Sequence, residues 1–553
     1  MMPAKSPFPT FLFALLPWVL GVAAAAQNKP GYDEALARYR VCMGRAAFKW
    51  HTEGRDRLAQ TRSPDALAIL AEDYDKTKDY PEYARYTMAT LFGRHFDDAQ
   101  AVETFRALRK ANSKPVDTWL WVRTLRIEAD RVGDAALVSI VQEDKNATHR
   151  AAAIAAIGES KSGNLAAVIV PTCVEFPKKE SDRMVLLGAM SGALFDNRRL
   201  VNDAKYRDAL TAYIGLLGDD VGLSHTAKVQ VARHLQWILK GPALFINPEP
   251  WLELLQRGEI KEPKKNDTRA APRFFGIETE GERFCYVVDM SDSMCKDISP
   301  SARPPLAAVT GPRPKKKKDA LLDESDLPWN KIKSRWDLAR EQLRISLSRL
   351  TPDKHFAIVW FGDESGTLDS CKGMIKATKA NIARVMAELD SIKPLSPEQF
   401  SPEDRVKAPD GKLRGRTNMH SGLRRAFGLA GKGFVEECGY VDPDALTEGC
   451  DTMFLLSDGS PSWDDFHLEE TNYLEGNAVL TTEYNTPMPQ PKRIVYHGPY
   501  SQDDNWLVED LRRMNAFRRI RMHCIGLGEA NMDLLRRLAE MGHGEVFSVG
   551  DKK

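Results

Sequence analysis

Residues 286–294, YVVDMSDSM, run from an apolar, β-favouring segment into an aspartate and two serines. Side chains alternate along an extended chain, so Asp289, Ser291 and Ser293 are expected to leave the same end of one strand. These residues place one carboxylate and two hydroxyls together at the carboxyl end of that strand. The stretch predicts either an ordinary turn at a strand end or one part of a site for a hard cation.

The sequence around this stretch alternates between strand and helix patterns from about residue 273 onward. Five apolar runs predict strands: RFCYVVDM, HFAIVWFG, TMFLLSDG, IRMHCIGLG and EVFSVG. Amphipathic segments between them predict helices, and this alternation indicates a doubly wound, mostly parallel α/β sheet. Ligands of such sheets bind beyond the carboxyl ends of the strands, which is where the opening stretch ends.

Two further loops are expected at the same edge of this sheet. GRTNMHSGL places Thr417 and Asn418 just before a predicted helix, and FLLSDGSPS ends a strand with Asp458 and Gly459. With the first loop they offer two carboxylates and three hydroxyls. Oxygen donors in that number suit Mg²⁺, Mn²⁺ or Ca²⁺, with water completing the shell. Each loop alone is explained equally well as a turn, so the prediction rests on all three together.

With these residues in view, residues 273–553 resemble a von Willebrand factor A domain that carries a metal-ion-dependent adhesion site. The resemblance implies that the hydroxyls of Ser291, Ser293 and Thr417 bind the ion directly. It implies that Asp289 and Asp458 act mostly through bound water. One coordination position is then left for an acidic side chain of a partner protein.

The resemblance also has departures and supporting positions. Asp292 and Arg416 stand where the family often has glycine, and neither position supplies a ligand. Asn418, Asp292 and Gly459 are expected to support the site. Asp289 is expected to matter most for ion binding, and the fold is expected to tolerate its loss.

Residues 27–260 show a different pattern, with apolar residues at helical spacing between short polar breaks. HRAAAIAAIG, DRMVLLGAMSGALF and YRDALTAYIGLLG are examples. Helices joined by short turns suggest stacked antiparallel pairs, and residues 130–260 resemble HEAT-type helical repeats. An irregular helical bundle is the alternative. The charged, proline-containing residues 261–272 predict a linker between two independently folding domains.

The amino terminus and the cysteines indicate the compartment. Residues 1–26 have a basic start, an apolar middle and a small-residue exit, which predicts a signal peptide cleaved after Ala26. An uncleaved anchor helix is the alternative, and no later segment is long and apolar enough to span a bilayer. We therefore expect a secreted or periplasmic protein without a transmembrane segment after cleavage. Cys438 and Cys450 flank a short loop and are the candidate disulfide.

Three long segments at the predicted ion-binding edge exceed what a compact domain of this family needs. They are residues 297–330, 396–414 and 464–503. We expect them to restrict which partner reaches the ion, with the third forming a small hairpin. Disordered insertions are the alternative.

The functional prediction is a divalent-cation-dependent protein-binding or adhesion module, not an enzyme. The net charge of +1 argues against nucleic acid as the main partner. One alternative is a scaffold whose helical half makes the main protein contacts. Another is a metal-dependent hydrolase with His420 as base, but the second aspartate of haloacid-dehalogenase-type phosphatases would fall at Ser291.

Overall fold

The protein is described by a computed structural model. It describes residues 31–76, 85, 88, 91–95, 98–112, 114, 117–160, 164–241, 245–258, 271–298, 321–394, 412–435, 440–470 and 494–549. The expected signal peptide lies outside these residues, as do most of the expected linker and much of each of the three expected insertions. No helix in the described ranges is both long and apolar enough to cross a bilayer.

The N-terminal region is helical, as predicted. Several helices begin where a polar side chain accepts a backbone N–H: Asn146 before α8, Asp203 before α11 and Ser224 before α12. The helices are α1 (Tyr32–Met43), α2 (Phe48–Gln60), α3 (Pro64–Lys76), α5 (Ala99–Ala111), α6 (Thr118–Val132), α7 (Ala135–Glu143), α8 (Ala147–Glu159), α9 (Ala166–Val174), α10 (Glu180–Asp196), α11 (Ala204–Gly215), α12 (His225–Leu239) and α13 (Pro248–Arg257).

The C-terminal region contains a mixed seven-stranded sheet in the order β13-β12-β9-β3-β4-β5, with β6 also pairing β4. The five strands from β13 to β4 pair in parallel, whereas β5 and β6 run antiparallel to β4. The strands of this sheet are β3 (Arg283–Asp289), β4 (His355–Phe361), β5 (Ser365–Thr367), β6 (Ile375–Lys376), β9 (Thr452–Ser457), β12 (Arg521–Leu527) and β13 (His543–Val549).

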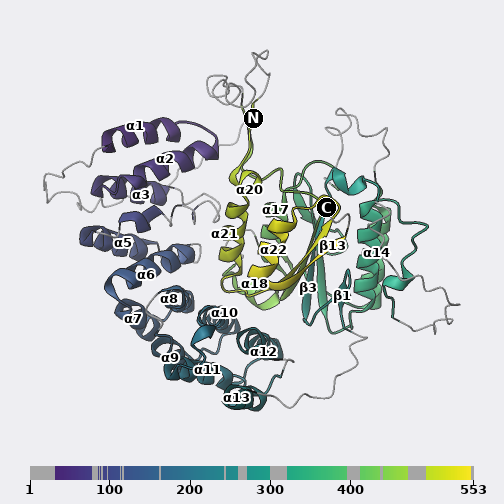
Figure 1. Cartoon of the computed structure of the whole chain (residues 1–553), viewed down its shortest axis with the longest axis horizontal. Coiled ribbons are helices and arrows are strands. Elements are labelled where there is room, and N and C mark those ends of the chain that lie inside the picture. Colours follow the sequence, from purple (N-terminus) through teal and green to yellow (C-terminus); the bar gives the residue numbers. More distant parts are fainter. Residues whose placement is uncertain are drawn as a thin grey trace, which may run out of the picture.

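Helices and short hairpins surround this sheet. Figure 1 shows α14 on one side of it and α21 on the other. The helices are α14 (Arg335–Ser348), α15 (Lys379–Ser391), α17 (Met419–Phe427), α18 (Pro443–Glu448), α20 (Pro499–Gln502), α21 (Asp504–Asn515) and α22 (Met532–Met541). The hairpin strands are β1 (Arg273–Phe274) with β2 (Ile277–Glu278), β7 (Leu429–Ala430) with β8 (Gly433–Phe434), and β10 (Leu468–Glu470) with β11 (Ile494–Tyr496).

The connections of the main sheet diverge between two central strands. After β3 the chain adds β4 on one side, and it later returns to place β9 on the other side. The carboxyl ends of β3 and β9 therefore lie side by side at the point where the connections that follow these two strands run to opposite sides of the sheet. In open α/β sheets, this is where ligands bind.

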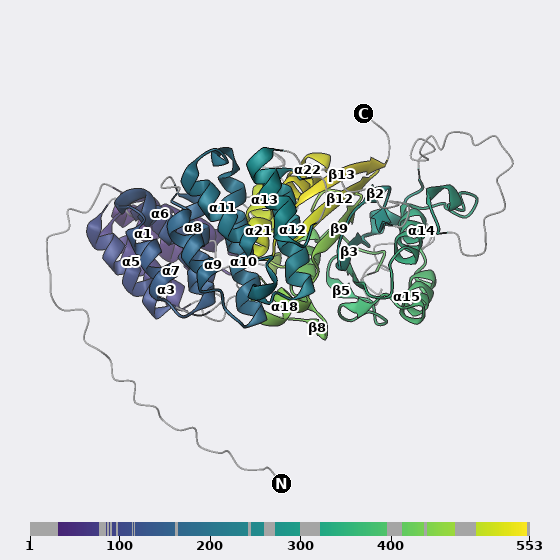
Figure 2. The same cartoon turned by 90° about the horizontal axis from the view of Figure 1, so that it is seen from below.

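The helical region curves along the side of the sheet that carries α21, as both views show (Figures 1 and 2). One cluster of buried apolar side chains continues from α6 through α12 into the sheet. Near the other end of the curve, the rings of Phe48 in α2 and Phe466 stack with centroids 4.2 Å apart. Independent folding of residues 273–553 stays a prediction, and this shared core means that the excised part would expose apolar surface.

Gly188 is a point of close backbone approach between the two regions. A Cβ at this position of α10 would lie 2.0 Å from the backbone oxygen of Phe517, which precedes β12. We expect Gly188→Ala to destabilise the protein by about 1–3 kcal/mol through overpacking, although the same change inside a helix is normally stabilising. Gly215→Ala is the control, because nothing lies within 4 Å of that site. Urea unfolding measures both, and equal stabilities would contradict this docking.

Candidate metal site

Asp289 is the last residue of β3 and is fully buried, with 0% of its surface exposed. Its Oδ1 accepts the backbone N–H of Ser291 at 2.9 Å, and its Oδ2 accepts the hydroxyl of Ser457 at 2.8 Å. Burial, followed by repulsion from Asp458, raises the pKa of Asp289 to about 7, against the hydrogen bonds from the two serines. The Asp289 carboxylate therefore accepts two hydrogen bonds from the protein. The prediction that the fold tolerates the loss of Asp289 did not take these bonds into account.

A continuous line of oxygens joins the first loop to the residue after β9. The hydroxyl oxygens of Ser291 and Ser293 lie 3.0 Å apart. Ser293 in turn donates its hydroxyl to Oδ1 of Asp458 at 2.7 Å. Asp458 directly follows β9 and is almost completely buried. The structure thus brings four of the predicted residues together at the diverging strand ends.

Thr417 reaches the same place through bonds between the loops. Asp292 donates its backbone N–H to the Gly415 carbonyl at 3.1 Å, which ties the first loop to the Thr417 loop. Ser462 donates its N–H to the Thr417 carbonyl and accepts the Thr417 N–H on its hydroxyl. The Thr417 hydroxyl lies 3.7 Å from where a Cβ on Gly459 would stand, so the two predicted positions face each other.

Asn418 acts on the loop that carries Thr417. Its Oδ1 caps α17 by accepting the backbone N–H of Ser421 at 3.0 Å. Its Nδ2 donates to Oδ1 of Asp465 at 2.8 Å and to the Asp363 carbonyl at 3.1 Å. Asn418 therefore connects the Thr417 loop with the start of the third expected insertion, which is a supporting role.

Arg335 is part of the site, and the sequence reasoning missed it. Its Nη1 lies 2.7 Å from Oδ2 of Asp458, and only 11% of the arginine side chain is exposed. A local signal existed, because Ser334 and Asp337 form a capping box that starts α14 at Arg335. That signal locates the helix start, but only the fold brings it next to Asp458.

The donor set fits a small, hard divalent cation. Adjacent oxygens of an octahedral Mg²⁺ shell, with bonds of 2.0–2.1 Å, lie roughly 2.9–3.0 Å apart. The separations of 3.0 Å between the two serines and 2.7 Å between Ser293 and Asp458 are close to that spacing. Within the described ranges, no three His, Cys, Asp or Glu side chains gather at a possible metal site. Hydroxyls and water would therefore supply most ligands here.

The candidate disulfide lies only partly within the described residues, and it stays a prediction. Cys450 is a free, buried thiol, and Cys438 lies outside the described residues. The Cys450 thiol is close enough to that of Cys285 in β3 for the two to affect each other's pKa, and its Sγ lies 3.9 Å from the Ala426 carbonyl. Cys450 sits just before β9 and turns into the core, which the sequence spacing of two cysteines around a loop does not reveal.

His420 packs inside the protein rather than facing the site. Its Nε2 lies 2.6 Å from Oδ2 of Asp510, and its ring stacks on Tyr500 with centroids 3.6 Å apart. Arg513 binds the other oxygen of Asp510 at 2.6 Å. This buried group attaches α17 to α21 and gives His420 no exposed position from which to act as a base.

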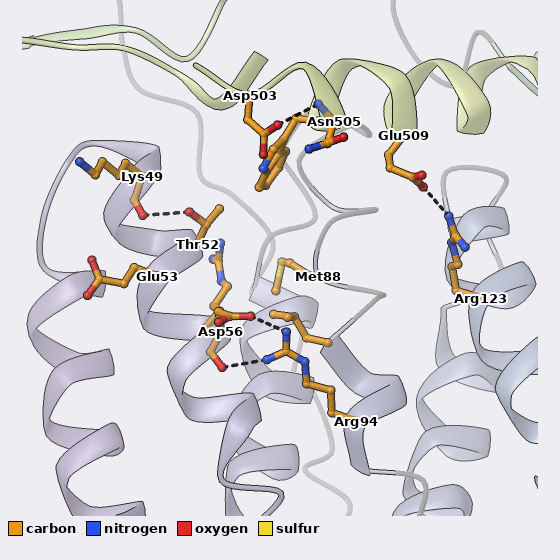
Figure 3. Close-up of a pocket in the computed structure, with 13 residues that line it drawn as sticks. Lys49, Thr52, Glu53, Asp56, Met88, Arg94, Arg123, Asp503, Asn505 and Glu509 are labelled. Carbon is orange, nitrogen blue, oxygen red and sulfur yellow. Dashed lines mark hydrogen bonds and ion pairs between the residues drawn. The ribbon is translucent and has the colours of Figure 1, made fainter. Parts of the chain in front are cut away.

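A separate pocket of about 550 Å³ lies between α2 and α21 (Figure 3). Two ion pairs lie within its lining: Arg94 with Asp56 at 2.7 Å, and Arg123 of the helical region with Glu509 of α21 at 3.0 Å. The pocket therefore belongs to the contact between the two regions and not to the ion site. Its lining residues are Lys49, Thr52, Glu53, Arg55, Asp56, Met88, Leu91, Arg94, Arg123, Asp503, Asn505, Trp506 and Glu509.

A scan against family models finds no match, and no curated protein matches the chain. Among solved structures, a von Willebrand factor type A protein from Catenulispora acidiphila aligns at 13% identity and a TM-score of 0.23. A mutant of the PilB minor pilin from Streptococcus sanguinis aligns at 15% identity and a TM-score of 0.26. Each alignment covers 50% of this chain, and 40% and 59% of the other two chains. Such low TM-scores carry no argument about this protein.

Proposed function

We propose that this protein is an extracytoplasmic, divalent-cation-dependent protein-binding or adhesion module. In this proposal residues 273–553 form a doubly wound, mostly parallel von Willebrand A domain with a metal-ion-dependent adhesion site. The ion is Mg²⁺, Mn²⁺ or Ca²⁺, and the partner is a protein that offers it an acidic side chain. The secreted or periplasmic location rests on the signal peptide predicted at residues 1–26.

The observation that supports this function best is the convergence of oxygens at the diverging strand ends. Asp289, Ser291, Ser293 and Asp458 come from two strands and form one hydrogen-bonded set. The loop that carries Thr417 is bonded to the same set. No chemistry is proposed for the site, because the one histidine considered as a base, His420, is enclosed by Asp510 and Tyr500.

A second candidate is a scaffold in which HEAT-like helical repeats make the main protein contacts. It is favoured by the contact between the helical region and the third expected insertion. Trp50 in α2 meets Tyr496 of β11 with ring centroids 6.5 Å apart, and Leu468 of β10 joins the same cluster. The helical surface therefore extends to the segment that adjoins the ion site through Asp465 and Asn418.

Chelation distinguishes the two functions. We expect a partner captured from the extracytoplasmic fraction by the full chain to be lost in EDTA and restored by Mg²⁺. Ser293→Ala should prevent capture and weaken Mn²⁺ binding roughly tenfold or more, because it removes both a ligand and the donor to Asp458. Ser391→Ala is the control, since this exposed hydroxyl only donates to the Glu388 carbonyl. Capture that persists in EDTA would assign the contacts to the helical region.

A further inference from the structure

Arg335 places a fixed positive charge beside the predicted ion site. Its guanidinium binds Oδ2 of Asp458, while Ser293 binds Oδ1 of the same carboxylate. The two oxygens of Asp458 therefore face different groups, and the arginine occupies the one directed away from the serines. An ion bound near Ser293 and the guanidinium of Arg335 would share this single carboxylate.

The surroundings of Arg335 hold it in this position. Its backbone N–H donates to the Lys296 carbonyl at 3.0 Å, which ties the start of α14 to the first loop. At the end of β12, a Cβ on Gly528 would lie 2.3 Å from Nη2 of Arg335. The glycine thus leaves the space that the guanidinium fills. With only 11% of its side chain exposed and Asp458 at 2.7 Å, the arginine holds its charge beside the site.

The formal charges of the site then decide what it binds. Among the side chains of this hydrogen-bonded set, Asp289 and Asp458 contribute two negative charges when both are ionised, and Arg335 contributes one positive charge. A divalent ion brings the sum to one excess positive charge, in a nearly buried setting where such an excess is unfavourable. One further carboxylate returns the sum to zero. Without the arginine, the ion alone would neutralise the site.

We infer that Arg335 makes ion binding depend on the acidic ligand, so that the cation and the partner's carboxylate bind cooperatively. This inference rests on the proposed function and adds how that site is regulated. The ion alone would bind weakly, and a protein without an acidic side chain at the contact would not retain it. Arg335 acts here as a positioning and charge-setting residue, since it contacts Asp458 and is no ligand of the ion.

Calorimetric titration of Mn²⁺ into the full chain tests the inference, with acetate as the carboxylate probe and chloride at equal ionic strength as the reference. We expect the parent protein to bind Mn²⁺ more tightly in acetate. Arg335→Gln should bind Mn²⁺ roughly tenfold more tightly than the parent in chloride, because it removes a positive charge near the ion, and should lose the acetate effect. Arg335→Lys should behave as the parent does. Arg344→Gln is the matched control, since this residue of α14 pairs with Asp390 at 2.7 Å.

The outcomes separate the inference from the proposed function. Mn²⁺ binding by the parent that does not respond to acetate, or Arg335→Gln with parental affinity, would overturn the inference and leave the ion site standing. No Mn²⁺ binding by any of the four proteins would overturn both. Melting curves in EDTA check that each variant is folded. If Arg335→Gln does not fold, the acetate response of the parent still decides.

Discussion

Asp289→Asn should lower the affinity for Mg²⁺ or Mn²⁺ roughly 10–100-fold and should at the same time stabilise the ion-free protein above neutral pH. The loss of affinity follows from the removal of one of the two carboxylates at the site. Asn keeps an oxygen for the Ser291 N–H and offers an amide to Ser457, so both hydrogen bonds of the buried side chain persist. The fold is therefore retained while the charge is removed.

The gain in stability follows from the pKa of Asp289. Burial and Asp458 raise this pKa to about 7, whereas the ordinary value is 3.8. Between these two values the folded state holds a proton that the unfolded state has lost. The free energy of unfolding therefore falls as the pH rises from about 4 to about 7 and then levels off, a total of about 4 kcal/mol. Asn removes this dependence, and in the parent the affinity for the ion should rise over the same range.

Two measurements check this result: calorimetric titration with the ion at pH 8, and melting curves in EDTA at pH 5 and pH 8. Asp289→Asn should melt above the parent at pH 8 and above it by a smaller margin at pH 5. Asp289→Ala should melt below Asp289→Asn at both, because it leaves the Ser291 N–H and the Ser457 hydroxyl without their acceptor. Asp297→Asn is the control, an exposed carboxylate of the same segment. Unchanged ion affinity in Asp289→Asn would contradict the adhesion-site proposal.

Local sequence patterns were sufficient for the five parallel strands and for the polar residues at their ends, but not for the short antiparallel strands β5 and β6. The apolar runs before Asp289 and Asp458 are long enough to predict buried strands. The structure forms β3 and β9 from these two runs. The site residues could be proposed because parallel strands bring their carboxyl ends to one edge of the sheet. The position of Thr417 near the other site residues was predicted in the same way, because its loop was expected at that edge of the sheet.

Contacts made by side chains far apart in the chain could not be predicted in this way. Arg335 and Asp458 are separated by 123 positions, and no local pattern connects them. Cys450 was matched to its nearest cysteine in the sequence, whereas the fold turns it toward Cys285. The apolar face of α10 predicts that this helix is buried. The spacing of its residues does not show that Gly188 will contact the backbone of Phe517 in the C-terminal region.

A buried arginine adds a polar attachment to the apolar packing between the helical region and the sheet, and Arg233→Met should reduce the free energy of unfolding by about 3 kcal/mol. Arg233 lies in α12 and is 1% exposed. It donates to the carbonyls of Asp451 and Glu280 at 2.8 Å each, and its guanidinium lies 3.4 Å from the Asp451 carboxylate. Removal of the arginine leaves a buried carboxylate without its cation and both carbonyls without their charged donor, while the Asp451 carbonyl keeps the Arg521 N–H at 3.0 Å.

Asp451 explains why the loss should be felt through the whole sheet. It precedes β9, and its Oδ2 accepts the backbone N–H groups of Glu282 and Arg283 at the start of β3. Arg233 thus holds the amino ends of the two strands whose carboxyl ends carry the ion site. Those two backbone N–H groups still stabilise the Asp451 carboxylate in Arg233→Met. The expected loss of unfolding free energy therefore lies at the lower end of the range for broken buried ion pairs.

Arg183→Met is the matched control for this experiment. Arg183 also donates to three carbonyls, those of Pro177, Gly222 and Val221, but all lie within the helical region. Urea unfolding followed by circular dichroism and by tryptophan fluorescence should show one transition for Arg183→Met. For Arg233→Met the two probes should separate, because the helical region loses a buried polar attachment to the sheet. Since the change lies at the opposite end of the strands, Mn²⁺ affinity should stay within about twofold of the parent. A loss of stability below about 1 kcal/mol, with coincident transitions, would show that apolar packing alone holds the two regions together.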